Sequence, residues 1–145
     1  MQIPEHLRPF EEPTLIVVTD HVHAKLYRAV GRDIEAIETI TTKADLMPQE
    51  RHEVGRGGEL SAADPEDDRQ EWSREQLYEK LNEDLHSRLQ RGEFANIAFT
   101  VPHENVNLLK ESLRIDLLKR ASIFVPKNLV GEDIIDLVDH IQEAA

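Results

Sequence analysis

The sequence predicts a single α/β domain in which a mixed five-stranded sheet carries helices on both faces. Three observations favour this class. Three strand-like segments separated by short turns come first, two apolar segments then alternate with helical patterns, and 145 residues suffice for one core. Short turns imply an antiparallel meander, and right-handed crossovers place the last two strands parallel to the first. The predicted strand order is 3-2-1-4-5, a ribonuclease H-like topology.

The first half of the chain supplies the meander. Residues 15–18 are a continuous apolar run, typical of a central strand that is buried on both faces and ends near residue 20. Asp20 and His21 form a turn, residues 23–30 form the second strand, and residues 31–33 form the next turn. The third strand is expected to place Ile34, Ala36, Glu38 and Ile40 on one face and Glu35, Ile37 and Thr39 on the other.

The second half alternates helices with strands. Ser73 and Gln76 form a capping box, with Trp72 and Leu77 as its hydrophobic staple, so a helix is predicted to begin there and to end at Gly92. Its apolar stripe is Leu77, Leu81, Leu85 and Leu89. The remaining elements are a strand at 97–101, a helix with Val106, Leu109 and Leu113, a strand at 122–125, and a helix with Ile134, Leu137, Val138 and Ile141.

Two segments fall outside this pattern. Residues 1–12 are polar and are predicted to be an N-terminal extension, so the domain is expected to cover residues 13–145. Residues 43–71 contain prolines, glycines and an acidic run at 64–68, and they predict a long acidic loop that is mobile at its centre. Loops of this length in compact domains are usually functional or disordered.

Composition excludes several functions. The net charge is −12, from 29 acidic and 17 basic residues, and such a field repels phosphate backbones and argues against DNA binding. The chain has no cysteine, which excludes disulfides and thiolate metal sites. No apolar run reaches the roughly 20 residues that span a bilayer, and no signal-peptide core is visible, so a cytoplasmic location is expected. The oligomeric state stays open.

The motif that points to a family lies in the long loop, at Gly55, Arg56, Gly57, Gly58 and Glu59. With the hairpin at 17–27 and the strand at 97–102, it resembles the middle domain of archaeal and eukaryotic class-one peptide-chain release factors. The resemblance covers roughly residues 13–143, and it is more specific to bacterial relatives of that domain, which are often labelled host-attachment proteins. The order and spacing of the elements carry the resemblance.

The resemblance implies a role for this loop at the ribosome. In release factors a glutamine follows the two glycines and helps water attack the peptidyl-tRNA ester, while the glycines allow close approach of the backbone. Gly57 and Gly58 match that pair, but Glu59 replaces the glutamine. An ionised carboxylate only accepts hydrogen bonds, whereas an amide also donates them. Release factors also use a codon-reading domain and a partner-binding domain, which we do not find in this sequence. We therefore expect no peptide release.

Three candidate sites in the sequence also have simpler structural interpretations. The glycine loop has three interpretations: a surface loop without a ligand, a retained contact with ribosome or tRNA, or a contact with a protein partner. Asp20, His21 and His23 alternate along extended chain and could share a metal ion, but a polar turn in which Asp20 binds its own backbone is the simpler interpretation. A nuclease site is not predicted, because Thr100 stands where a second carboxylate would be needed.

These observations lead to two functional hypotheses. The first is a non-catalytic binding module with a degenerate Gly-Gly-Gln-type loop, associated with ribosomes or translation and without cofactor or metal. The alternative is a hydrolase that acts on an ester-like substrate through the loop. The sequence offers no fixed acid–base pair, which favours the first hypothesis.

Overall fold

A five-stranded sheet forms the centre of the protein. The computed structural model describes residues 1–42 and 65–145, and for residues 65–70 it describes only the helical backbone. The strands are β1 (Phe10–Thr19), β2 (His23–Gly31), β3 (Asp33–Thr41), β4 (Asn96–Thr100) and β5 (Ala121–Val125). Their order is β3-β2-β1-β4-β5, with the first three antiparallel and β4 and β5 parallel to β1. The predicted topology is confirmed, with its first strand at the centre.

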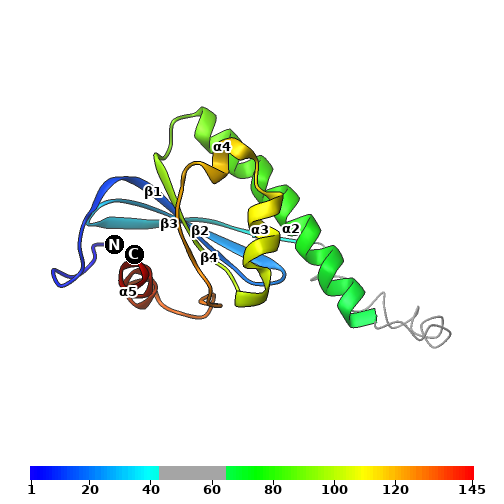
Figure 1. The fold of residues 1–145 in the computed structure, drawn as a ribbon. Helices are drawn as coiled ribbons and strands as arrows, with labels where there is room; N and C mark the ends of the chain where they lie inside the picture. The colour runs from blue at the N-terminus through cyan, green and yellow to red at the C-terminus, as the bar shows by residue number, and fades with distance from the viewer. Residues whose placement is uncertain (43–64) are drawn as a thin grey trace.

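Helices cover both faces of this sheet. They are α2 (Pro65–Gln90), the 3-10 helix η2 (His103–Asn105), α3 (Val106–Ser112), α4 (Ile115–Leu118) and α5 (Ile134–Ala144). In Figure 1 the long helix α2 lies with α3 and α4 on one side of the sheet, and α5 lies on the other. Within the described part of the chain, none of the helices has the length and apolar character to cross a membrane.

Strand β1 divides the core into two layers because its side chains alternate between the faces. Leu15 and Val17 pack in the layer beneath α2, α3 and α4, whereas Ile16 and Val18 pack in the layer beneath α5. All four are at most 1% exposed. The continuous apolar run therefore reflects a central strand with helices on both sides, as the sequence indicates.

Helix α2 begins earlier than its capping box predicts. The helix starts at Pro65, and Ser73 lies inside it with 2% exposure, so the predicted start near residue 73 is wrong and residues 65–71 are not loop. Proline suits the first helical position, because its missing N–H would have no partner there. The predicted end is confirmed: Gly92 has a φ of 71°, and its N–H donates to the Leu89 carbonyl over 3.0 Å.

The N-terminal segment is part of the domain. Ile3 and Leu7 are 4% and 3% exposed and belong to the core layer beneath α5. The backbone N–H of Arg8 donates to the Gln142 side chain over 2.9 Å, and Gln142 Nε2 donates back to the Arg8 carbonyl over 2.7 Å. Figure 1 marks both ends of the chain beside α5. The predicted boundary at residue 13 falls inside β1, and residues 1–12 are not a separate extension.

A β-bulge in β3 changes which residues share a face. Leu26 pairs with Glu38 but Tyr27 pairs with Ala36, so Ile37 is the extra residue. Ile34 packs beneath α5, whereas Ile37 and Ile40 both pack in the opposite layer. The prediction that Ile34, Ala36, Glu38 and Ile40 share one face is therefore wrong. Because of the bulge, the Glu38 side chain points towards α2 and forms an ion pair with Arg88 of that helix.

Tyr78 provides a test of packing in this core. Its hydroxyl is buried and has no hydrogen-bond partner among the described residues, and burial raises its pKa from 10.0 to about 12, against a lowering effect of Arg74. We expect Tyr78→Phe to be neutral or stabilising by up to about 1 kcal/mol at pH 7, because an unsatisfied polar group is removed.

The pH dependence of that variant has a definite sign. Between pH 10 and about 12 the unfolded chain loses the Tyr78 proton while the folded chain keeps it, so wild-type stability falls as pH rises. The variant lacks this contribution, and its advantage should grow above pH 10. Urea unfolding at pH 7 and pH 10.5 measures both effects. A loss of more than about 1 kcal/mol at pH 7 would show that the hydroxyl has a partner.

Candidate functional site

The glycine loop lies outside the described residues, and only its flanking positions can be placed. Gly55, Arg56, Gly57, Gly58 and Glu59 fall within the segment 43–64 that separates Thr42 from the start of α2. Thr42 is 3% exposed, and its backbone N–H donates to the carbonyl of Val22 over 3.3 Å. The described chain before the loop therefore ends beside the turn that joins β1 to β2.

Asp20 holds that turn together. Its Oδ1 accepts hydrogen bonds from the backbone N–H groups of Val22 over 2.8 Å and of His23 over 2.6 Å, and its own N–H donates to the His23 carbonyl over 3.0 Å. Asp20 Oδ2 lies 3.2 Å from His23 Nδ1. These are the bonds of an Asx turn, the simpler of the two interpretations that the sequence leaves open.

The two histidines of the turn do not converge on one point. His23 contacts Asp20, whereas His21 Nδ1 lies 3.3 Å from the amide nitrogen of Asn105, which follows β4 and is 2% exposed. Among the described residues no group of three His, Asp or Glu side chains could hold a metal ion. In the described part of the chain, Asp20 and His23 contact each other within the turn, and His21 contacts Asn105 outside it.

The ends of the two central parallel strands meet at the same place. Val18 pairs with Thr100, and Thr19 Oγ1 donates to the carbonyl of Thr100 over 3.1 Å. The hydroxyl of Thr100 is buried and has no hydrogen-bond partner in the described part of the chain. His103 and Glu104 follow in η2 and are exposed. Thr42 contacts Val22 in the turn that follows β1, so the segment 43–64 leaves the described chain at this same end of the sheet.

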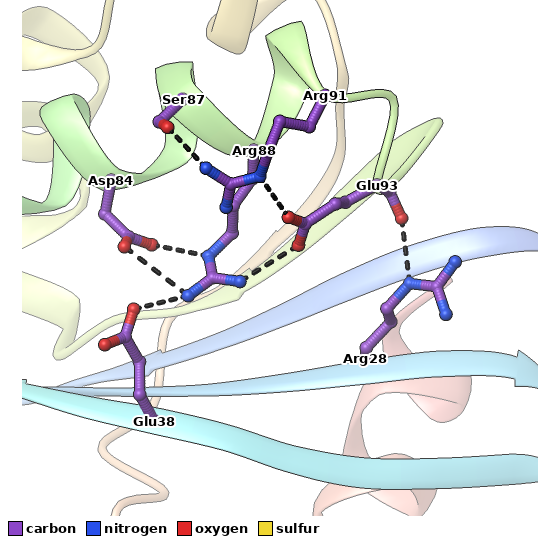
Figure 2. A network of polar contacts seen from close by, with 7 residues as sticks. All are labelled: Arg28, Glu38, Asp84, Ser87, Arg88, Arg91 and Glu93. Atoms are coloured by element: carbon purple, nitrogen blue, oxygen red, sulfur yellow. Dashed lines mark hydrogen bonds and ion pairs between the residues drawn. The ribbon is translucent and has the colours of Figure 1, made fainter.

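A second polar cluster, centred on Arg88, was not predicted from the sequence. Figure 2 shows Arg88 among three carboxylates: its Nε donates to Asp84 over 2.7 Å, its Nη1 donates to Glu93 over 2.9 Å, and its Nη2 donates to Glu38. Arg88 is 9% exposed. Burial alone would lower its pKa, but the hydrogen bonds to Asp84, Glu38 and Glu93 raise it.

Glu93 extends this cluster to a second strand. Its carboxylate also accepts from Arg91 over 2.6 Å, and its carbonyl accepts from Arg28 of β2 over 2.9 Å (Figure 2). Burial alone would raise the pKa of Glu93, and the hydrogen bonds from Arg91 and Arg88 lower it. The carboxylates pair with Arg88 and Arg91, and Arg28 donates to the Glu93 carbonyl, so the cluster ties α2 and the segment after it to β3 and β2. Its i, i+4 pair Asp84–Arg88 was the only signal visible in the sequence.

The architecture, a meander followed by two parallel strands with helices on both faces, is that of a release-factor-type domain. The sequence matches the model of the bacterial archaeo-eukaryotic release factor family 12 over residues 13–141, and the chain belongs to this family. The resemblance predicted from the sequence is thereby confirmed. No curated protein matches the sequence.

Solved structures support the fold. The archaeal translation termination factor aRF1 superposes with a TM-score of 0.51 at 12% identity, over 90% of this chain and 37% of that one. A structure described only as an archaeal protein superposes with a TM-score of 0.50 at 12% identity, over 91% of this chain and 37% of its own. This chain therefore spans little more than a third of each of these structures, and at this identity the likeness concerns the fold alone.

Proposed function

We propose that this protein is a non-catalytic binding module that contacts the ribosome through the loop carrying Gly57, Gly58 and Glu59. Family membership and the fold shared with a translation termination factor support the ribosome as partner. The two glycines suit close approach to RNA, and the carboxylate in place of the glutamine suits binding better than release chemistry. Because ribosomes are the proposed partner, the proposed place of action is the cytoplasm.

The observation that supports the non-catalytic hypothesis is that two polar side chains of the turn between β1 and β2, Asp20 and His21, are held by contacts within the protein. Asp20 uses both carboxylate oxygens within its own turn, and His21 is engaged by Asn105. These contacts fix the Asp20 carboxylate and the Nδ1 side of the His21 ring in position. These side chains stiffen the edge from which the loop departs, which supports a role in presenting the loop to a partner.

Ribosome pelleting tests this proposal. Purified protein should sediment with ribosomes through a sucrose cushion at physiological salt, where a Debye length of roughly 8 Å screens the repulsion between RNA and the protein's net charge of −12. The double variant Gly57→Ala, Gly58→Ala should remain in the supernatant because its loop cannot approach closely. Lys80→Ala, which loses one hydrogen bond to the Thr41 carbonyl, is the matched control and should pellet as wild type does.

Two outcomes would contradict the proposal. If the glycine variant pelleted as well as wild type, the loop would not be the contact. Turnover of a model ester such as p-nitrophenyl acetate, lost in Glu59→Gln, would support the hydrolase instead. A role in host attachment is a separate physiological hypothesis, and an attachment assay with a deletion strain would test it.

A further inference from the structure

The last strand of the sheet leaves an open edge. β5 pairs with β4 on one side, and on its other side it pairs with no strand in the described part of the chain. Its side chains alternate: Phe124 packs in the layer beneath α3 and stacks on Phe99 with ring centroids 5.0 Å apart, whereas Ile123 packs in the layer beneath α5. An extended peptide can add to such an edge through backbone hydrogen bonds.

A groove accompanies this edge on the α5 side. It has a volume of about 560 Å³ and lies between β4, β5, the end of α5 and the start of β1. Its apolar wall comprises Phe10, Ala98, Ile123 and Ile141, with Ser122 and Gln142 beside them. A strand added to β5 would direct every second side chain to this face. β5 contributes Ser122 and Ile123 to the lining, so apolar side chains on that face of a bound segment would meet the β5 side of the groove.

Four basic side chains lie near the edge, at the two ends of β5 or beside Phe124 on the face opposite the groove. Lys119 and Arg120 precede β5, Lys127 follows it, and Lys110 Nζ lies 4.9 Å from the centre of the Phe124 ring. All four basic side chains are exposed, and none forms an ion pair with a described residue. The acidic residues at the edge, Glu11 and Glu12, line the groove on the opposite face.

We propose that the β5 edge binds an extended acidic segment of a partner protein as a sixth strand, with apolar side chains in the groove and carboxylates towards Lys110 and the basic ends. A second copy of this chain fits poorly. Two β5 strands paired antiparallel about Ile123 would bring Lys119 and Arg120 next to Lys127, and like charges there repel. The β5 edge is at the opposite side of the sheet from β3, and this proposal does not depend on the proposed ribosome contact.

A synthetic peptide tests the surface directly. An eight-residue peptide that alternates valine and glutamate, capped at both ends, is titrated into ¹⁵N-labelled protein. The amide signals of β5 should shift. The same peptide with alternate backbone nitrogens methylated should bind roughly tenfold more weakly, because it cannot form the ladder. A peptide that alternates valine and lysine should not bind.

Charge variants complete the test. The double variant Lys119→Glu, Arg120→Glu should weaken peptide binding roughly fivefold or more, whereas Lys80→Glu, beside β3 at the far edge of the sheet, should change it less than about twofold. Equal binding of the methylated peptide would overturn the added strand. Dimerisation through β5 in sedimentation experiments would also overturn the proposal. A third contradicting result would be that the protein binds no peptide but binds a ten-nucleotide single-stranded RNA tightly, through Lys119 and Arg120.

Discussion

Replacing Arg88 with methionine is expected to lower the free energy of unfolding by about 2–4 kcal/mol. The substitution keeps most of the buried aliphatic length but leaves three carboxylates, on Asp84, Glu93 and Glu38, facing one another without their shared cation. Losing one partner of a buried charge cluster usually costs more, but these carboxylates are 24%, 26% and 40% exposed and can regain water. Urea unfolding at pH 7 followed by circular dichroism measures the loss.

The pH dependence of this loss follows from Glu93. Its pKa is lowered in the fold from 4.5, so its ionised form contributes stability above that pH, and the contribution disappears as the pH falls and the carboxylate takes up a proton. The difference between wild type and Arg88→Met should therefore shrink below pH 4.5.

A control variant separates the buried cation from an exposed one. Arg91 is 54% exposed and also pairs with Glu93, and Arg91→Met should cost less than about 1 kcal/mol. If Arg88→Met and Arg91→Met lowered the free energy of unfolding equally, the buried Arg88 would not be what holds α2 to the neighbouring strands.

The second large effect concerns the centre of the long helix. Leu81 is fully buried between α2 and the sheet, and Leu81→Ala is expected to cost about 2–5 kcal/mol through lost burial and a residual cavity. Ile115→Ala, at a position that is 68% exposed, provides the control and should change stability by less than about 0.5 kcal/mol. A loss below about 1 kcal/mol for Leu81→Ala would mean that the helix does not pack as the structure has it.

The strand order of the sheet could be predicted because the sequence features that indicate its strands and turns are local. The apolar run at 15–18, the turn residues at 20–21 and 31–33, and the short connections leave few topologies once right-handed crossovers are required. The start of α2 could not be predicted in the same way. Ser73 and Gln76 have the spacing of a capping box, but sequence spacing cannot show that the helix already continues from Pro65.

The polar contacts were harder to predict because they depend on tertiary structure. Periodicity places Glu38 on the face of Ile34, and only the bulge at Ile37 moves it to the face where Arg88 lies. The pairing of His21 with Asn105 joins residues 84 positions apart, and no sequence pattern indicates it. The local bonds of Asp20 were predictable, because an Asx turn needs only the residues that follow. The motif at Gly55 to Glu59 lies outside the described residues and remains a prediction.

A peptide-release assay on loaded ribosomes tests the non-catalytic reading most directly. Ribosomes carrying peptidyl-tRNA are mixed with wild-type protein or with Glu59→Gln, and a class-one release factor serves as the positive control. We predict no release above buffer from wild type, because Glu59 cannot donate as the amide does. We also predict little or none from Glu59→Gln, because a net charge of −12 opposes deep entry into an RNA-lined catalytic site, which a contact of the loop with the ribosome does not require. Release by wild type that is abolished in Gly58→Ala would contradict the account and make this protein an enzyme.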